Sequence, residues 1–264
     1  MKDLVLVTGA STGIGYEMAK LLAAQKLDLV LVARSAQKLA ELKKELENEH
    51  GVQVWVFDQD LSKEANSVLL YETVKAAGLQ VTMLVNNAGM GVYGDFMETP
   101  LLEELQMINL NISALVILTK LFGNDMKENA YGRILNVASL LSFLPFPYYS
   151  VYSATKAFVL AFSETIAAEL EDSGVVVNTL CPGPVDTPFT TREMLGTNAY
   201  KTNKPVSPMI VAKVGADLLL KGKGKKIVGF NNWFISNLPR VTPDFLMMKI
   251  KKKLASPVIK KMYN

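Results

Sequence analysis

Three side chains suited to moving a proton lie in the middle of the sequence, at Ser139, Tyr152 and Lys156. Tyr152 and Lys156 are four residues apart, so on a helix they share one face, one turn apart. A tyrosine with a pKa of about 10 is a poor base at neutral pH, but a nearby ammonium stabilises the phenolate and lowers that pKa. A surface pair is the alternative for these two residues alone. Ser139, thirteen residues before Tyr152, favours acid–base chemistry because its hydroxyl could hold a substrate oxygen.

A glycine-rich segment stands near the start of the chain, Thr8-Gly9-Ala10-Ser11-Thr12-Gly13-Ile14-Gly15, between a short apolar run and a helical pattern. Gly9 permits a tight turn, Gly13 lets the backbone approach a pyrophosphate, and Gly15 lets helix and strand pack closely. The N–H groups at the helix start then meet the phosphate charge. The segment predicts nucleotide binding, and a purely structural glycine turn is the alternative.

The next apolar run ends at Arg34, where a cofactor with a free 2′-hydroxyl usually meets an acidic residue, roughly 20 residues past the glycine loop. Arg34, with Lys38 one turn on, suits a 2′-phosphate instead, so we expect NADP(H) to be favoured over NAD(H). A solvated arginine that opens a helix is the alternative. Asp60 could accept from an adenine amino group while Leu61 packs near the ring, or Asp60 could cap the following helix.

The elements that must position these residues alternate along the chain. The expected strands are rich in Val, Ile and Leu, as in a parallel sheet covered on both faces. They are 4–8, 29–33, 52–57, 81–86, 133–138, 175–180 and 226–230. Helical patterns such as 15–26, 37–49 and 63–76 lie between them. We therefore predict an α/β fold, a Rossmann-like doubly wound parallel sheet of seven strands with helices on both faces.

Composition narrows the chemistry and the setting. A single cysteine, Cys181, and a single histidine, His50, exclude a disulfide framework and clustered metal ligands, so no metal is expected. No apolar run approaches the roughly 18 residues of a membrane span, and Leu4–Val7 is too short for a signal peptide, so we expect a cytoplasmic protein. The net charge of +3 conceals an excess of ten positive charges from Lys213 onward.

Together these motifs resemble the short-chain dehydrogenase/reductase family over residues 4 to about 190. Asn86-Asn87-Ala88-Gly89 and Pro182-Gly183-Pro184-Val185-Asp186-Thr187 match two further family motifs. The family's catalytic asparagine, serine, tyrosine and lysine map onto Asn109, Ser139, Tyr152 and Lys156. The resemblance extends cofactor binding to Gly9, Ser11, Thr12, Gly13, Ile14, Gly15, Arg34, Asp60, Leu61, Asn87, Ala88, Gly89, Tyr152, Lys156, Pro182, Gly183, Val185 and Thr187.

The resemblance implies hydride transfer between a nicotinamide and a substrate carbon. Tyr152 would give or take the hydroxyl proton, Lys156 would lower the pKa of Tyr152 and hold the ribose, and Asn109 would hold a water. The alternative for Asn109 is an amide that kinks a helix in the core. Many NADP-preferring relatives carry a basic residue where this chain has Thr12, so the expected preference rests mainly on Arg34.

The substrate is expected to be an apolar ketone or secondary alcohol, of steroid, bile-acid or 3-oxoacyl type. The segment 140–149 would line the substrate cleft opposite residues 90–93, and it offers no Arg or Lys for a small carboxylate. Ordinary packing under the lid is the alternative for these side chains. A nucleotide-binding redox sensor or scaffold without turnover is the alternative function, although the intact Tyr152 and Lys156 disfavour it.

We expect residues 1–243 to form one dehydrogenase domain with a substrate lid at about 188–208, and residues 244–264 to form a basic, loosely amphipathic appendage. Lys249–Lys253 and the apolar residues near them predict peripheral contact with an anionic membrane, and a solvated helix face is the alternative. Few aromatic residues accompany these lysines, so nucleic-acid binding is not expected. Family members pair the helix of Tyr152 across a dimer axis, which implies a homodimer or homotetramer.

Overall fold

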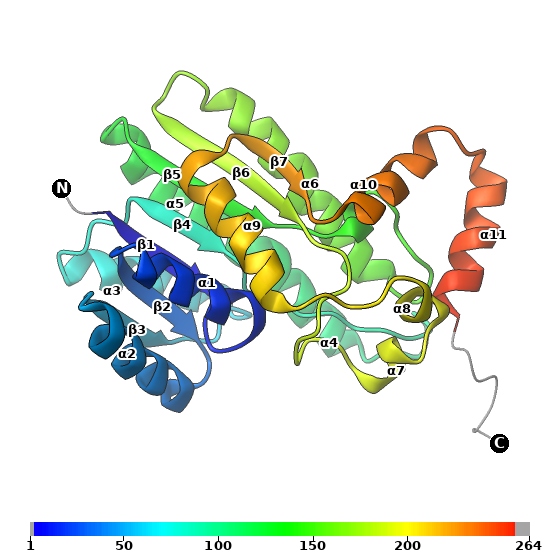
Figure 1. Ribbon diagram of the computed structural model, residues 1–264, viewed down its shortest axis with the longest axis horizontal. Helices are drawn as coiled ribbons and strands as arrows, with labels where there is room; N and C mark the ends of the chain where they lie inside the picture. Colours follow the sequence, from blue (N-terminus) through cyan, green and yellow to red (C-terminus); the bar gives the residue numbers. More distant parts are fainter. Residues whose placement is uncertain (1–2, 257–264) are drawn as a thin grey trace.

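A computed structural model describes residues 3–256 of the chain, and it contains one seven-stranded, entirely parallel sheet (Figure 1). The strand order is β3-β2-β1-β4-β5-β6-β7. The strands are β1 (Leu4–Thr8), β2 (Asp28–Ala33), β3 (Val54–Asp58), β4 (Met83–Asn86), β5 (Gly132–Val137), β6 (Val175–Cys181) and β7 (Gly224–Ile227). The predicted doubly wound sheet is therefore confirmed. Its last strand ends earlier than expected, because Gly229, at φ +88°, turns the chain into the next helix.

Helices cover both faces of the sheet, which explains why the central strands are apolar on both sides. One face packs against α1 (Gly13–Ala24), α2 (Ala36–His50) and α9 (Pro208–Lys221), as Met18, Leu42 and Val211 show by their burial in one core cluster. The other face packs against α3 (Glu64–Ala76), α5 (Ala114–Glu128) and α6 (Ser150–Glu169). These two apolar layers fix the sheet whose carboxyl edge carries the predicted site.

The chain changes direction between β1 and β4. It first builds outward from β1 through β2 to β3, then crosses back to place β4 on the other side of β1. In an open parallel sheet, the connections on either side of such a reversal diverge and leave a crevice at the carboxyl ends of the strands. The glycine segment after β1 and Asn87 after β4 both lie at this crevice.

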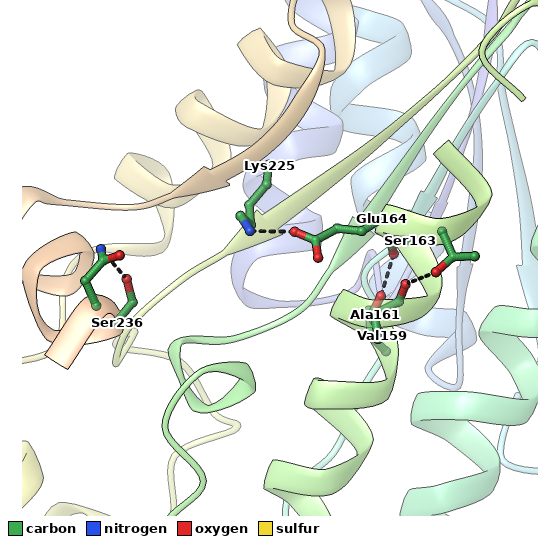
Figure 2. Close-up of polar contacts among 8 residues, drawn as sticks. Val159, Ala161, Ser163, Glu164, Lys225 and Ser236 are labelled. Atoms are coloured by element: carbon green, nitrogen blue, oxygen red, sulfur yellow. Dashed lines mark hydrogen bonds and ion pairs between the residues drawn. The ribbon is translucent and has the colours of Figure 1, made fainter. Parts of the chain in front are cut away.

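Helix α6, which carries Tyr152 and Lys156, is held to the sheet by polar contacts in its second half. Figure 2 shows the ion pair between Glu164 of α6 and Lys225 of β7, which ties the helix to the outermost strand. The hydroxyl of Ser163 donates to Val159 O within the helix at 2.6 Å (Figure 2). The same hydroxyl accepts a hydrogen bond from Asn136 of β5 at 2.9 Å. These contacts anchor the end of α6 opposite to the one that enters the site.

One continuous helical stretch, Leu101–Glu128, is long and apolar enough to span a membrane by length and composition. It consists of α4 (Leu101–Ile108), a π-helical turn η1 (Asn109–Ser113) and α5. This stretch contradicts the expectation that no apolar run approaches the length of a membrane span, because its mean hydropathy is high although polar and charged side chains stand among its apolar residues. In the structure, Leu118 and Phe122 of this stretch are buried in the core beneath the sheet.

The segment after β6 builds an irregular wall beside the sheet. It contains α7 (Arg192–Leu195), α8 (Asn198–Thr202), α10 (Phe230–Asn237), a 3-10 turn η3 (Leu238–Arg240) and α11 (Asp244–Ala255), and a further 3-10 turn, η2 (Leu140–Ser142), follows β5. The expected lid contains α7 and α8. The expected appendage begins at α11, which packs against α8 at the end of the molecule far from β3 (Figure 1). Its remaining residues, 257–264, lie outside the described part of the chain.

Candidate active site

A cavity of about 910 Å³ opens along the carboxyl edge of the sheet, from the end of β2 to helix α11. This volume is at the upper end of the range of ligand pockets, so it can hold a dinucleotide and a substrate together. Apart from Gly15 and Asn109, every predicted site residue lines it. These are Gly9, Ser11, Thr12, Gly13, Ile14, Arg34, Asp60, Leu61, Asn87, Ala88, Gly89, Ser139, Tyr152, Lys156, Pro182, Gly183, Val185 and Thr187.

The glycine segment forms a tight turn between β1 and α1. Gly9 and Gly13 have φ values of +67° and +59°, a region that other residues rarely adopt. A Cβ atom on Gly15 would lie 2.4 Å from Gly9 O and 2.5 Å from Asn87 Nδ2, so a larger residue cannot fit without moving the backbone. Gly15 therefore acts by letting the turn and helix approach each other, which explains why it does not line the cavity.

Thr8 and Asn87 fasten this turn to the end of β4. The Thr8 hydroxyl donates to Val85 O at 3.1 Å and accepts from the backbone N–H groups of Asn87 and Ala88, each at 3.0 Å. The Asn87 amide donates to Thr8 O at 2.9 Å and to Gly9 O at 3.3 Å. Asn87 therefore holds the loop in shape as well as lining the cavity, and the hydroxyl of Thr8 is a supporting group that the sequence motif alone did not identify.

The cofactor end of the cavity, next to the end of β2, carries positive charge. Arg34 and Lys38 are exposed at the start of α2 and both line the cavity. Asp60 lies nearby and accepts from the hydroxyl and the N–H of Ser62 at 2.8 and 3.1 Å. Burial raises the pKa of Asp60, but the hydrogen bonds from Ser62 and the charge of Arg34 outweigh it and lower the pKa overall. Asp60 thus stabilises the turn before α3, whose N-cap is Lys63, while its charge remains at the cavity wall.

Ser139, Tyr152 and Lys156 meet in the middle of the cavity. Ser139 follows β5 and donates a hydrogen bond to the Tyr152 hydroxyl, while its own oxygen accepts from Leu141 N at 3.1 Å. The ammonium of Lys156 lies 6.0 Å from the centre of the Tyr152 ring and donates to Val137 O at 2.8 Å. Ser142 supports the arrangement, because its hydroxyl donates to Lys156 O at 2.7 Å.

Burial dominates the electrostatics of this group. It raises the pKa of Tyr152, and the hydrogen bond from Ser139 acts in the opposite direction. Burial also lowers the pKa of Lys156 to about 8, so the ammonium loses its proton more readily than an exposed lysine does. A tyrosine in this environment holds its proton firmly until positive charge is brought near its oxygen.

Asn109 does not reach this group. Its side chain is partly exposed and makes no hydrogen bond within residues 3–256. Asn111, two residues later, is buried and reaches the backbone beside the site. Its amide donates to Met90 O at 2.9 Å and to the Thr155 hydroxyl at 3.1 Å, and its oxygen accepts from Met90 N at 3.0 Å. The structure therefore places Asn111, and not the predicted Asn109, beside Tyr152 and Lys156.

The position of Asn111 follows from the helical spacing of its neighbours. Met107, Asn111, Ala114 and Leu118 recur at intervals of three and four residues and are all buried. This stripe could have identified Asn111 from the sequence, since Asn109 falls outside it. The π-helical turn η1 begins at Asn109, and single π-turns in helices often occur at functional sites.

The remaining part of the cavity is apolar and aromatic. We call its wall the substrate wall; its members line the cavity and belong to one cluster of packed side chains, Leu144, Phe146, Tyr149, Tyr152, Met247 and Leu254. The Tyr152 ring packs against Phe189 and Tyr149, with ring centres 5.6 and 6.3 Å apart. The wall joins two distant stretches of sequence, residues 144–152 and 247–254, so periodicity could not have revealed its membership.

Helix α11 closes the substrate wall. The hydroxyl of Tyr93 donates to Ala255 O at 2.8 Å, and the amide of Asn198 donates to Lys253 O at 3.0 Å. Met247, Ile250, Lys251 and Leu254 of α11 line the cavity. Part of the segment expected to be an appendage thus forms a boundary of the cavity.

Comparisons with known proteins agree with this geometry. A family model described as short chain dehydrogenase matches residues 3–196. The very-long-chain 3-oxoacyl-CoA reductase of Anas platyrhynchos is 33% identical over 97% of this chain and 82% of its own. The 17-beta-hydroxysteroid dehydrogenase type 3 of Homo sapiens is 36% identical over 75% of this chain, which spans 63% of that protein's length. A short-chain dehydrogenase from Sphingobium yanoikuyae, solved with NADPH, superimposes with a TM-score of 0.80 at 28% identity, covering 90% of this chain and 93% of that one.

Proposed function

This chain belongs to the short-chain dehydrogenase/reductase family, and from that premise we propose that it interconverts a ketone and a secondary alcohol on a large apolar substrate with NADP(H). It is an oxidoreductase of the NAD(P)(H)-dependent type. One observation carries the proposal. Ser139, Tyr152 and Lys156 converge midway along a single cavity, with the glycine loop at one end and an apolar wall at the other.

In the proposed mechanism the substrate oxygen lies between Ser139 and Tyr152. Ser139 donates to that oxygen, and Tyr152 donates its proton when a ketone is reduced or takes the proton when an alcohol is oxidised. The bound nicotinamide supplies or accepts the hydride. The ammonium of Lys156 stabilises negative charge on the Tyr152 oxygen, which counters the rise in the pKa of Tyr152 caused by burial.

We propose that Asn111 takes the place that sequence comparison assigned to Asn109. A Cβ atom built on Gly89 would lie 3.2 Å from the Asn111 oxygen and 3.5 Å from the Lys156 ammonium, so both groups border the same small space. Asn111 holds Met90, and Met90 lines the cavity next to Gly89. Asn111 therefore positions the loop after β4, and its oxygen lies beside the Lys156 ammonium, through which a proton could reach Tyr152.

The expected preference for NADP(H) rests on Arg34 and Lys38, which line the cavity end where the adenosine ribose would lie. Their positive charges attract a 2′-phosphate and offer no acceptor for a 2′-hydroxyl. Arg34→Asp should reverse the preference, with the ratio of kcat/KM values for NADP⁺ and NAD⁺ falling by roughly 100-fold. An unchanged ratio would show that Arg34 does not select the cofactor.

The substrate wall suits fused rings or a long acyl chain, because its aromatic and aliphatic side chains surround the reactive group. Its similarity to proteins named as a 3-oxoacyl-CoA reductase and a 17-beta-hydroxysteroid dehydrogenase supports the same substrate classes. The absorbance of NADPH, followed with a panel of oxosteroids, oxo bile acids and 3-oxoacyl compounds, tests this proposal. Tyr152→Phe should lose at least about 1000-fold in kcat while cofactor affinity stays within about twofold.

The panel has three informative outcomes. Turnover that disappears in Tyr152→Phe, with cofactor affinity retained, supports both the reaction and its general acid. Turnover that survives the substitution contradicts the role given to Tyr152. A protein that binds NADPH but reduces no member of the panel contradicts the proposed substrate classes.

We also propose a homodimer or homotetramer. Helix α4 packs against α6, and both expose apolar side chains, with Leu102, Leu105 and Phe158 at 73%, 46% and 39% exposure. A second copy would cover these side chains, which water otherwise surrounds. Light scattering at micromolar concentration measures the assembly, and Leu102→Glu with Leu105→Glu should yield monomers.

A cytoplasmic protein with peripheral membrane contact remains our proposal for its location. Helices α10 and α11 expose a set of large apolar side chains beside exposed lysines: Phe230, Trp233, Phe234, Phe245, Leu246 and Met248, with Lys249, Lys252 and Lys253. Aromatic and aliphatic groups flanked by lysines suit the interface of an anionic bilayer. Co-sedimentation with phosphatidylserine vesicles should fall at least about tenfold in Phe234→Ser with Phe245→Ser, and equal binding would end the proposal.

A further inference from the structure

Lys251 differs from the other lysines of α11 in where its side chain lies. It is 8% exposed and lines the cavity, whereas Lys249, Lys252 and Lys253 are exposed. Met247 and Leu254 are four residues before and three residues after Lys251, so the three share one face of the helix. Lys251 is therefore part of the cavity wall and not of the surface expected to meet a membrane.

The ammonium of Lys251 has no protein partner. Within residues 3–256 it makes no hydrogen bond and no ion pair. Burial lowers the pKa of Lys251, and the charge of Asp244, seven residues earlier on the same helix, opposes that shift. A largely buried lysine whose ammonium has no hydrogen-bonded or ion-paired partner is left with only the more distant charge of Asp244, so a ligand that brings an anion would stabilise it.

The cavity lining at the substrate end supplies a further hydrogen-bond donor and no carboxylate among the described residues. The hydroxyl of Tyr149 also lines the cavity, is buried, and has no hydrogen-bond partner in the described part of the chain. Asp60 is the single acidic residue among the described lining residues, and it lies with Arg34 at the opposite end. A ligand that fills the substrate end must therefore bring its own acceptor oxygens.

The substrate wall includes the neighbours of Lys251 on α11 as well as Tyr152. Met247 and Leu254, which flank Lys251 on α11, pack in the same apolar cluster as Tyr149 and Tyr152, together with Leu144 and Phe146. A substrate with an oxidisable carbon against Tyr152 thus meets apolar surface first and a cation at its far end. A ligand that fits this wall would have an apolar body and an anionic group.

We propose that Lys251 binds a carboxylate at the far end of the substrate, so that the enzyme prefers apolar keto- and hydroxy-carboxylates over their neutral counterparts. The inference rests on the proposed function and narrows its substrate class. It also corrects the expectation that the cleft offers no lysine for a carboxylate, because the lysine comes from α11 and not from residues 140–149.

The experiment compares matched pairs that differ only at the carboxyl group, which is charged in one member and a neutral methyl ester in the other. An oxo bile acid and an oxo long-chain fatty acid are each assayed beside their methyl esters with NADPH. Wild type, Lys251→Met, Lys251→Arg and the exposed control Lys252→Met are used. In wild type, kcat/KM for each acid should exceed that for its ester by at least about tenfold. Lys251→Met should abolish that difference by slowing the acid, while Lys251→Arg and Lys252→Met should keep most of it.

The ester is the internal control for folding. A variant that loses acid and ester activity equally has a structural defect, so Lys251→Arg and the thermal midpoint of each variant are then decisive. An acid preference that survives in Lys251→Met overturns the inference, as does equal use of acid and ester by wild type. A fall in NADPH affinity in Lys251→Met, without a change in the acid-to-ester ratio, also overturns it, because the lysine would then serve the cofactor.

Failure of the proposed function gives a different result. Absence of turnover with the acids, the esters and neutral ketones contradicts the proposed reaction. Titration calorimetry of the NADPH-bound protein with the same acid–ester pairs then tests Lys251 by binding alone. Equal affinity for acid and ester in that titration would reject the carboxylate site.

Discussion

The two ends of the cavity are built in different ways. The cofactor end comes from the turn after β1, the end of β2 and the end of β4, and three hydrogen bonds to the hydroxyl of Thr8 hold two of these segments together. The substrate end comes from α8, α11 and the segment after β5, which lie far apart in the sequence. The first end inherits its shape from the register of a parallel sheet. The second depends on side chains that pack between irregular segments.

This difference has a functional meaning. A dinucleotide has one shape, so an end built from backbone and glycine suits it, and changes there should affect every substrate equally. The substrate end can change its side chains without disturbing the sheet, as expected for loops on a rigid scaffold. Four substitutions test whether the two ends are separable in this way.

The largest effect is expected at the turn after β1. Gly15→Ala would force a methyl group against Gly9 O and Asn87 Nδ2, and displacement of the loop should cost about 3 kcal/mol, or roughly 100-fold in NADPH affinity. Fluorescence titration with NADPH measures this change. Gly123→Ala is the control, because its added Cβ would lie 3.6 Å from Ile134, an ordinary contact. Equal affinity in both variants would show that the loop is not tightly constrained.

The next effect concerns the boundary between the ends. Asn111→Ala removes the partner of both Met90 backbone groups and should lower kcat/KM by about 30-fold. Asn109→Ala, which removes no hydrogen bond within the described residues, should change kcat/KM by less than about threefold. Steady-state kinetics of the two variants decide between the residues. A larger loss in Asn109→Ala would restore the assignment made from the sequence.

Lys156 gives a pH test at the same boundary. Its pKa is lowered from 10.5 to about 8 by burial, so the unfolded chain binds a proton that the folded protein lacks between these values. The folded state therefore gains stability as pH rises from about 8 to about 10.5. Between about pH 7.5 and pH 9.5 the free energy of unfolding of the cofactor-free wild type should rise by about 2 kcal/mol relative to Lys156→Met, measured in urea. A constant difference between the two proteins would mean that Lys156 keeps its ordinary pKa.

The smallest effect is expected at the substrate end. Tyr93→Phe removes the hydrogen bond to Ala255 O but keeps the ring against Tyr149, so it should loosen α11 by about 1 kcal/mol. The KM for a bulky ketone should rise roughly fivefold while NADPH affinity stays unchanged. Kinetics and cofactor titration on one preparation check both values. A parallel loss of cofactor affinity would show that the two ends are coupled.

How far the sequence could predict the molecule follows the same division. Strands such as β1 and β6 were placed correctly because a buried parallel strand is apolar at most positions. The glycine turn and the Tyr152–Lys156 pair were recognisable because their geometry is local. Asn111 was missed because two asparagines stand two residues apart and only the burial of Met107 and Leu118 distinguishes them.

The residues that form the substrate end could not be predicted from local sequence patterns. Lys251 looked like one of several surface lysines, since nothing in its neighbours on the chain shows that it faces a cavity. Its burial depends on the docking of α11 against α8 and on Tyr93, which is 162 residues from its hydrogen-bond partner Ala255. Contacts of this kind are set by tertiary packing, which neither periodicity nor charge pattern contains.

That separation of 162 residues also bears on how the protein acquires its shape over time. Contacts between distant parts of a chain carry the largest loop-closure cost, and they form after contacts between neighbours. The strand pairs β1–β2 and β2–β3 join segments that are close in sequence, so their loop-closure cost is smaller and they can form earlier. We therefore expect a refolding chain to gain affinity for NADPH before it can discriminate among substrates, with the closing of α11 as the step that ends maturation.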